Sequence, residues 1–259
     1  MKEVHLLMNS LNEDVLTREL TDLGLKRGDM LIVHSSLKSL GFIEGGAPGV
    51  INSILNAVGP EGTLIVPALT GKREDSPECP PVFNVMDTPC WTGIIPETVR
   101  KMKGAKRSLH PTHSVSALGR EVDYVTCGHQ FTRSPCDMGS PYFLNAINNG
   151  HILLVGVDQE SNTSIHSCEE LARVPYHLQK DVTEAYITGY NGETIKVENR
   201  LHNWEKPETD FNKLDTLYME AGFMRMKQIG NAKVRYIDAG KMFTFTIDLL
   251  KKNNTFLIK

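Results

Sequence analysis

The chain has 259 residues, of which 40% are hydrophobic and 23% are charged, and its formal net charge is −3. This length is enough for one large domain with a sizeable core, and the composition excludes a largely disordered or fibrous chain. The nearly balanced charge gives no electrostatic reason to expect nucleic acid or an anionic membrane surface as a partner. No apolar run approaches the ~18 residues that span a bilayer, so no membrane segment is expected.

The N-terminus and the cysteines indicate a reduced, cytoplasmic protein. Residues 1–13 contain no apolar core and no small-residue cleavage site, so they do not predict a secretory signal. The five cysteines are widely spaced and odd in number, which does not predict a disulfide framework. The sequence leaves a homo-oligomer open.

Helices and strands are predicted to alternate through the first two thirds of the chain. The predicted helices cover residues 11–23, 48–58, 94–102 and 162–172, and the predicted strands cover 30–33, 63–66, 115–118 and 151–155. The strand–helix–strand spacing between 30 and 66 favours a right-handed crossover and a parallel pair. The proline-rich stretch 71–90 is predicted to be a long loop, and loops of that length are often functional.

The C-terminal third has a different pattern. Asn191-Gly192 and Gly230-Asn231 each separate two strand-like runs, at 184–188 with 194–198 and at 223–229 with 233–237, which predicts two hairpins. Helices are predicted at 212–221 and 240–251. We therefore expect a single α/β domain over residues 1–259. Its mixed sheet would carry helices on both faces, with a parallel first half and antiparallel hairpin additions in the C-terminal third.

The first candidate site follows the predicted strand 30–33 and reads His34-Ser35-Ser36-Leu37. Ligands of open α/β sheets bind beyond the carboxyl ends of the strands. Two hydroxyls and their backbone N–H groups at that place suit a phosphate or a carbonyl oxygen. The alternative is an ordinary turn in which the serines make local hydrogen bonds.

The second candidate is the segment 107–114, which contains Ser108 and His110 and is dense in groups that contact phosphates and thioesters. His110 and His113, taken with Cys127 and His129, also suggest a zinc site and hence a zinc hydrolase. Only one residue separates Cys127 from His129, which is not the spacing of paired zinc ligands. We therefore predict no metal and keep the hydrolase as an alternative.

The third candidate is the pair His166 and Glu169, which share a helix face at a spacing of i, i+3. A carboxylate beside an imidazole fixes the orientation of the ring and raises its basicity, as a general base near neutral pH requires. Cys168 points to another face and is predicted to be a core residue rather than a nucleophile. The alternative for His166 and Glu169 is a surface helix pair without a catalytic role.

The segment from Gly28 to Leu37 resembles the opening motif of the aminoglycoside 3-N-acetyltransferase family, antibiotic N-acetyltransferases that are distinct from the GNAT superfamily. The resemblance covers nearly the whole chain, at residues 45–46, 58–64, 107–111, 153–156, 161–166 with Glu169, and 229–233. It implies a transferase that moves an acetyl or short acyl group from CoA to an amino group of an amino sugar.

Site residues also follow from this resemblance. It implies that His166 is the general base, Glu169 its carboxylate partner and His34 a second histidine near the thioester. The residues implied to hold CoA are Ser35, Ser36, Leu37, Ser108 and His110. Because the thiolate of CoA is a good leaving group, no covalent enzyme intermediate is required, and direct transfer in a ternary complex is expected.

The acceptor is the part of this interpretation that the sequence leaves open. The acidic candidates for binding a polycationic drug are Glu160, Glu170, Glu205 and Asp210, with Lys206 among them. Lys206 and Arg200 would instead suit the phosphates of a nucleotide-linked amino sugar for surface polysaccharide synthesis. A catalytically silent CoA-binding module is a further alternative, and the paired His166 and Glu169 argue against it.

Overall fold

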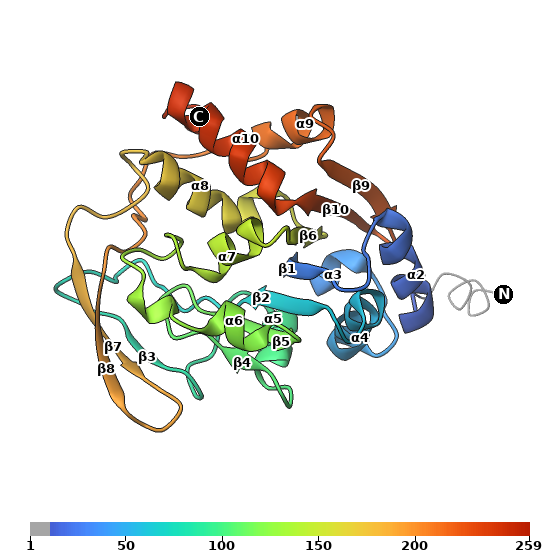
Figure 1. Ribbon diagram of the computed structural model, residues 1–259, viewed down its shortest axis with the longest axis horizontal. Coiled ribbons are helices and arrows are strands. Elements are labelled where there is room, and N and C mark those ends of the chain that lie inside the picture. Colours follow the sequence, from blue (N-terminus) through green and yellow to red (C-terminus); the bar gives the residue numbers. More distant parts are fainter. Residues whose placement is uncertain (1–10) are drawn as a thin grey trace.

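A seven-stranded mixed sheet forms the centre of the molecule in the computed structural model, which describes residues 11–259 (Figure 1). Residues 1–10, on which the prediction about a secretory signal mainly rests, lie outside the described residues. The order of the strands is β4-β5-β2-β1-β6-β10-β9. Their bounds are β1 Met30–Ser35, β2 Thr63–Pro67, β4 Lys106–Arg107, β5 Val115–Gly119, β6 His151–Val155, β9 Met224–Ile229 and β10 Ala232–Asp238.

The directions of these strands confirm a mixed sheet and correct one detail. β1 runs parallel to both β2 and β6, and the predicted hairpin β9–β10 joins β6 in antiparallel fashion. β5, however, is antiparallel to β2, so the first half of the sheet is not parallel throughout. The reason is that residues 108–114 join β4 and β5 as an antiparallel pair, and β5 of this pair lies beside β2 and runs in the opposite direction.

Helices cover both faces of this sheet, as the sequence predicts. Alternate side chains of β1 divide between the two cores: Ile32 packs toward α7, α8 and α10, whereas Leu31 and Val33 pack toward α2 and α4. The helices are α2 Glu13–Leu23, α3 Leu37–Leu40, α4 Gly46–Val58, α5 Ile94–Arg100, α6 Val122–Thr126, α7 Pro141–Ile147, α8 Ser164–Ala172, α9 Lys213–Glu220 and α10 Ala239–Lys252. The sequence missed α3, α6 and α7 because four to seven residues are too few to show a helical period.

A second sheet of three strands stands apart from the first. It contains the predicted hairpin β7 Thr183–Thr188 and β8 Thr194–Asn199, together with β3 Val82–Asn84 from within the predicted loop. β3 lies parallel to β7, so this hairpin is not an addition to the main sheet. Phe83, Ala185 and Ile187 form the small core of this sheet.

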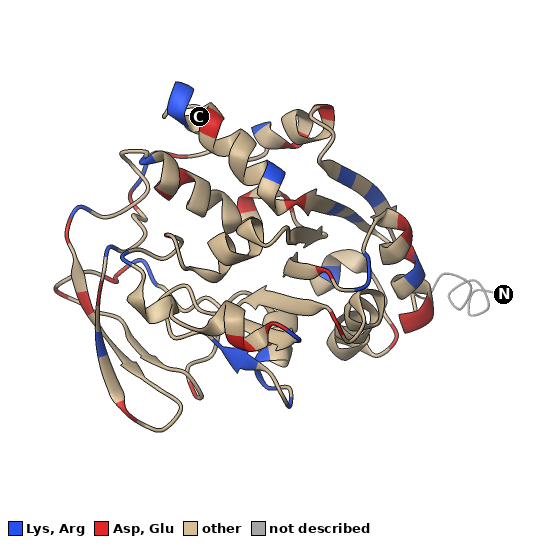
Figure 2. Cartoon of the chain, in the orientation of Figure 1, with Lys and Arg blue, Asp and Glu red and all other residues tan. Residues whose placement is uncertain are grey.

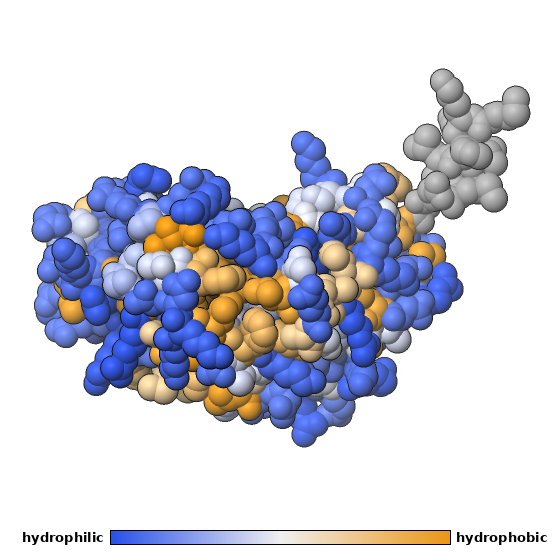
Figure 3. All heavy atoms as spheres, turned by 90° about the horizontal axis from the view of Figure 1, so that it is seen from above, coloured by the Kyte–Doolittle hydropathy of each residue, from blue (hydrophilic) through white to orange (hydrophobic). Residues whose placement is uncertain are grey.

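Charges and apolar atoms are distributed as in an ordinary globular protein. Acidic and basic positions alternate over the chain in Figure 2, and the basic stripe on β9 faces acidic residues of α2, where Lys227 pairs with Glu19 at 2.8 Å. Apolar atoms form a band across the middle of the face seen in Figure 3, between two hydrophilic ends. Within residues 11–259, no helix has both the length and the hydropathy that crossing a membrane requires. All five cysteines are free.

Candidate active site

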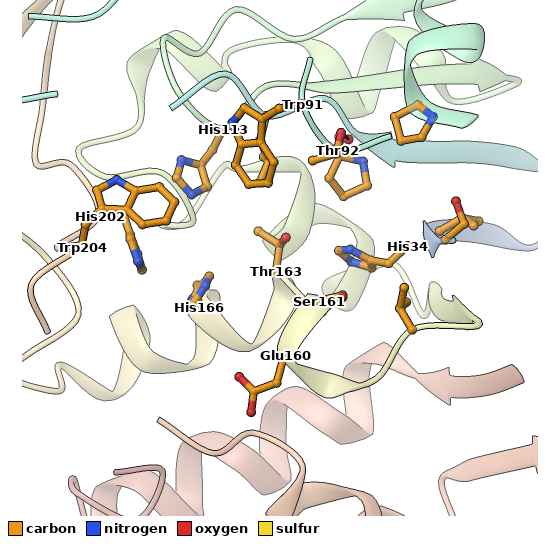
Figure 4. A pocket seen from close by; sticks show the side chains of 16 residues that line it. His34, Trp91, Thr92, His113, Glu160, Ser161, Thr163, His166, His202 and Trp204 are labelled. Atoms are coloured by element: carbon orange, nitrogen blue, oxygen red, sulfur yellow. Dashed lines mark hydrogen bonds between the residues drawn. The ribbon is translucent and has the colours of Figure 1, made fainter. Parts of the chain in front are cut away.

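A cavity of about 370 Å³ opens at the carboxyl ends of β1 and β6 (Figure 4). Residues from six stretches of the sequence line it: 33–35, 67–69, 91–96, His113, 157–166 and 202–204. Gly156, which follows β6, has a φ of +65°, and a Cβ there would lie 2.5 Å from the Cβ of Ser39. Glycine is therefore required where the chain turns from β6 into the cavity wall.

His34 and Ser35 reach the cavity from the end of β1, as predicted. Both carry a buried polar atom without a protein partner, His34 Nε2 and Ser35 Oγ. Burial, with a smaller contribution from the neighbouring His166, lowers the pKa of His34 to about 3. His34 is therefore a neutral imidazole at physiological pH, and two buried polar atoms at the cavity wall have no hydrogen-bond partner in the protein.

His166 and Glu169 form the predicted pair on α8. His166 Nδ1 lies 2.6 Å from Glu169 Oε2, Glu169 is fully buried, and His166 lines the cavity. Asn162 accepts a hydrogen bond from the amide of Ser164 at the start of this helix. Because Nδ1 is occupied by Glu169, Nε2 is the ring nitrogen of His166 left for the cavity.

The pKa of His166 is set by two opposing effects. Glu169 raises the basicity of the ring, as expected, but burial outweighs the hydrogen bond and lowers the pKa of His166 to about 4. The carboxylate is also shared, because His177 Nδ1 lies 3.2 Å from the same Oε2 atom. Burial raises the pKa of Glu169, but the two imidazoles outweigh it and hold that pKa well below its usual range.

Three imidazoles meet at this point, and we call His166, His177 and His202 the catalytic cluster. Their ring centroids lie 4.6 to 5.0 Å apart, and their ligand nitrogens lie within 4.8 Å of one another. A metal ion there would need His177 as a neutral ligand, whereas its two nitrogens face Glu169 and Glu170 at 3.2 and 3.3 Å. This donor set favours an imidazolium over a metal ligand.

Four of the five residues that the resemblance implies for CoA lie outside the cavity; only Ser35 lines it. Ser36 donates its amide to Val155 O, so that amide is not free to bind an oxyanion, and Leu37 begins α3. Ser108 and His110 have no exposed surface, which corrects their expected contact with CoA.

Ser108 and His110 belong instead to a buried group behind β5. His129 Nδ1 pairs with Ser108 Oγ at 2.9 Å, and His129 Nε2 lies 3.0 Å from the carbonyl oxygen of Pro135. The rings of His110 and His129 lie 4.5 Å apart, and we call these two residues the inner cluster. Burial lowers the pKa of His129 to about 4 and that of His110 well below its usual range.

The alternative zinc site does not form. Cys127 is exposed, whereas His110 and His129 are fully buried, and both ring nitrogens of His129 have protein partners. His113 lines the catalytic cavity instead. This geometry removes the ligand set on which the zinc hydrolase was predicted. Cys168 is buried in the core beside Ile165, as expected.

The wall of the cavity also contains two tryptophans and one carboxylate, Trp91, Trp204 and Glu160. The other acidic candidates lie elsewhere: Glu170 is behind His177, and neither Glu205 nor Asp210 lines the cavity. Arg200 lines a second cavity, separate from Lys206, so the two do not form a phosphate site together. The basis for a nucleotide-linked acceptor is therefore lost.

Sequence reasoning missed His177 and His202 as site residues. Arg173 ends α8 in the left-handed conformation, with a φ of 58°, and Pro175 prevents the helix from continuing. The chain then turns back and places His177 against His166, eleven positions earlier. No short spacing signals this contact, and His202 arrives from beyond β8.

Comparison with known proteins connects this geometry to one family. Residues 32–251 match the model of the family described as aminoglycoside 3-N-acetyltransferase. Aminoglycoside N(3)-acetyltransferase IX of Micromonospora chalcea is 27% identical over 97% of this chain and 98% of that protein. The prophage-derived aminoglycoside N(3')-acetyltransferase-like protein YokD of Bacillus subtilis is 29% identical over 94% of each chain.

Solved structures agree with these sequence relatives. The binary complex of AAC-IIIb with CoASH superimposes with a TM-score of 0.83 at 25% identity, covering 94% of this chain and 97% of that one. Aminoglycoside acetyltransferase AAC(3)-Xa has a TM-score of 0.82 at 27% identity, covering 97% and 98%. The similarity therefore extends over the fold as a whole.

Proposed function

The chain belongs to the aminoglycoside 3-N-acetyltransferase family of acetyl-CoA-dependent enzymes, and we propose that it acetylates an amino group of an aminoglycoside-type amino sugar. The observation that carries this proposal is the 2.6 Å contact between His166 Nδ1 and Glu169 in the wall of the cavity. It supplies an oriented imidazole with a free nitrogen where an amine must lose a proton.

His166 acts as the general base in this proposal. An ammonium group cannot attack a thioester, so a proton must leave before or during the attack. The lowered pKa of about 4 keeps His166 neutral at physiological pH, so Nε2 is able to accept that proton. Glu169 then stabilises the imidazolium that forms, because the carboxylate is already in contact with Nδ1.

His34 and Ser35 stabilise the acetyl carbonyl oxygen as negative charge develops on it. A neutral His34, protonated on Nε2, and the Ser35 hydroxyl are donors whose atoms have no protein partner. Hydrogen-bond donors that are already oriented, in a site with little water, stabilise an oxyanion effectively. His34 and Ser35 take the role of oxyanion donors in place of the backbone amides that the sequence suggested, since the Ser36 amide already donates to Val155 O.

We expect transfer in a ternary complex, without an acetyl-enzyme. None of the 16 residues that line the cavity is a cysteine, and no lining hydroxyl is hydrogen-bonded to a histidine. A nucleophile activated by a neighbouring base is therefore not available in this wall. The amine attacks the thioester carbon, the C–S bond breaks, and the CoA thiolate leaves and takes up a proton.

A thiol-release assay tests the proposal. Purified enzyme with acetyl-CoA should release CoA thiol only when an amino-sugar acceptor is present, and mass spectrometry should find one acetyl group on the acceptor. CoA alone should raise the melting temperature, since a ligand at ~100 times its Kd adds about 2.7 kcal/mol to stability. Release that ignores the acceptor, or no thermal shift with saturating CoA, would contradict acetyl transfer.

A further inference from the structure

His177 is a second imidazole on the carboxylate that serves His166. Its side chain is only 2% exposed, and its ring lies nearly parallel to that of His166, with centroids 4.6 Å apart and an interplanar angle of 23°. Its Nδ1 is 3.2 Å from Glu169 Oε2, and its Nε2 is 3.3 Å from Glu170 Oε1. One ring therefore lies between two consecutive carboxylates, with a hydrogen bond to Glu170 and an ion-pair contact, without hydrogen-bond geometry, to Glu169.

Glu170 is held in place on its far side. Its Oε2 accepts a hydrogen bond from Ser134 Oγ at 2.5 Å, and its Oε1 accepts one from the amide of Cys136 at 3.0 Å. Both carboxylate oxygens of Glu170 therefore have donors, and the side chain lies at the edge of a second cavity of about 760 Å³, which His177 also lines. His177 thus lies at the second cavity and stacks on His166, which lines the first.

Two adjacent buried carboxylates need a compensating charge, because an unpaired ion is costly away from water. Burial by itself lowers the pKa of His177, but Glu169 and Glu170 outweigh burial and raise it to about 9. Other titratable or charged groups surround His177. On the side of the first cavity these are His166, His202, His113, Lys206 and Tyr176. Around the second cavity they are Arg133, Arg173, Arg200 and Asp137.

We infer that His177 is a positioning residue for acetyl transfer, which as a cation clamps Glu169 behind His166. The inference rests on the proposed function, in which His166 is the base. With Glu169 held as an anion, it accepts a hydrogen bond from His166 Nδ1–H, and that tautomer leaves Nε2 unprotonated toward the cavity. Without the cation, Glu169 binds a proton more readily, and the tautomer of His166 is no longer fixed.

Two substitutions separate this role from simple packing. His177→Gln removes the charge, and we expect kcat to fall at least about tenfold while the KM for acetyl-CoA stays within twofold. His177→Arg keeps a cation between the carboxylates, with room toward the second cavity, and should recover most of kcat. If His177 only fills space, both variants should lose kcat equally, in proportion to the fall in their melting temperatures. That result would overturn the inference.

The pH profile gives a second readout on the same acceptor. Wild-type kcat should decline as the pH rises through about 9, where His177 loses its proton, whereas His177→Arg should not show this decline. Ionisation of the acceptor affects the wild type and His177→Arg equally, so it does not contribute to the difference between their pH profiles. His151→Gln is the matched control, because His151 lies 3.9 Å from Asp29 and outside the cavity. Its kcat and pH profile should match the wild type, and an alkaline limb common to wild type and His177→Arg contradicts the inference.

A measurement on the free protein keeps this inference distinct from the proposed function. Imidazole ¹⁵N chemical shifts should show a doubly protonated His177 at pH 7, identified by the signal that disappears in His177→Gln. A neutral His177 at pH 7 refutes the clamp even if the enzyme acetylates amino sugars. A protonated His177 in a protein that releases no thiol supports the charge assignment and refutes acetyl transfer instead.

Discussion

The catalytic cluster and the inner cluster contain the same residue type in similarly buried places, yet they differ in chemistry. The ring nitrogens of His177 and one of His166 face the carboxylates of Glu169 and Glu170. In the inner cluster, His129 meets a hydroxyl and a carbonyl, and His110 Nδ1 accepts from the amides of Thr112 and His113.

Burial lowers the pKa of His129 and that of His166 alike, whereas His177, with a carboxylate facing each ring nitrogen, has a raised pKa. Ser108 accepts from the amide of Val115, which leaves its hydroxyl hydrogen for His129 Nδ1, while Nε2–H donates to Pro135 O. This arrangement fixes a neutral tautomer without a place for a second proton. In the catalytic cluster, the carboxylates raise the pKa of His177 to about 9, whereas burial lowers the pKa of His166 to about 4 and that of His202 far below its usual range.

Removal of His166 gives the largest expected effect. His166→Ala should reduce kcat by about 10²–10⁴-fold, the usual loss of a general base, while acetyl-CoA still binds. Steady-state kinetics and the CoA-induced melting shift measure both quantities. A variant that retains more than about a third of the wild-type kcat at neutral pH would remove His166 from the role of base.

Stability should depend on pH with a maximum near pH 6.5. The folded-state pKa values of His34, His129 and His166, at about 3, 4 and 4, lie below the ordinary 6.5. Below pH 6.5 the unfolded chain therefore binds more protons, and each histidine costs about 1.4 kcal/mol of stability per pH unit. His177 acts in the opposite direction, because its contribution is complete below 6.5 and is lost as the pH rises through about 9.

Urea unfolding between pH 4.5 and pH 9.5 measures this dependence. We expect a steeper loss on the acid side, where the lowered pKa values of His110, His113 and His202 add to those of the other three histidines. On the alkaline side, His177 and the buried thiols of Cys136 and Cys168 contribute. A stability that is flat between pH 6.5 and pH 5 would show that these rings are not held neutral in the folded state.

Changes in the inner cluster should lower stability without lowering catalysis. His129→Leu leaves the hydroxyl hydrogen of Ser108 without an acceptor and the Pro135 carbonyl without a donor, which costs about 1–3 kcal/mol. The melting temperature should fall by about 2–4 °C for each kcal/mol in a chain of this size. The kcat of the folded fraction should stay within twofold. A loss of kcat like that of His166→Ala would mean that the two clusters are not separate.

The smallest effect concerns Glu160, the one carboxylate in the cavity wall. Glu160→Gln keeps an acceptor for the amide of Phe211 but removes the charge. Because exposed ion pairs contribute about 0.2–1 kcal/mol, the KM for a cationic acceptor should rise about two- to fivefold, with kcat unchanged. Glu205→Gln, outside the cavity, is the control and should change neither value. Equal effects in both variants would contradict a direct contact with Glu160.

Local patterns were sufficient for much of the fold and for one part of the site. Hydrophobic periods and turn residues predicted β1, β2, β6, α8 and both hairpins close to their observed bounds. The spacing of His166 and Glu169 also predicted their contact, since both lie on one helix.

Features that depend on distant contacts were not predictable. The short β3 gains its strand conformation from β7, about a hundred positions later in the chain. His177 and His202 reach Glu169 and His166 only through turns whose course tertiary packing decides. The segment 107–114 resembles a ligand site in composition, but packing of β5 against β2 buries Ser108 and His110.

The place of β1 in the sheet affects how the chain is made. Its neighbour β6 is about 120 positions later, with Leu31 aligned to His151, so nascent chains that end before β6 leave one edge of β1 unpaired. An apolar, unpaired strand edge is a template for association with other chains. During synthesis at about 5–20 residues per second, that edge of β1 stays unpaired for several seconds at least, until β6 is made and pairs with it. The growing chain thus exposes an unpaired strand edge until the strand that leads to His166 is made, because β6 pairs with β1, which carries His34.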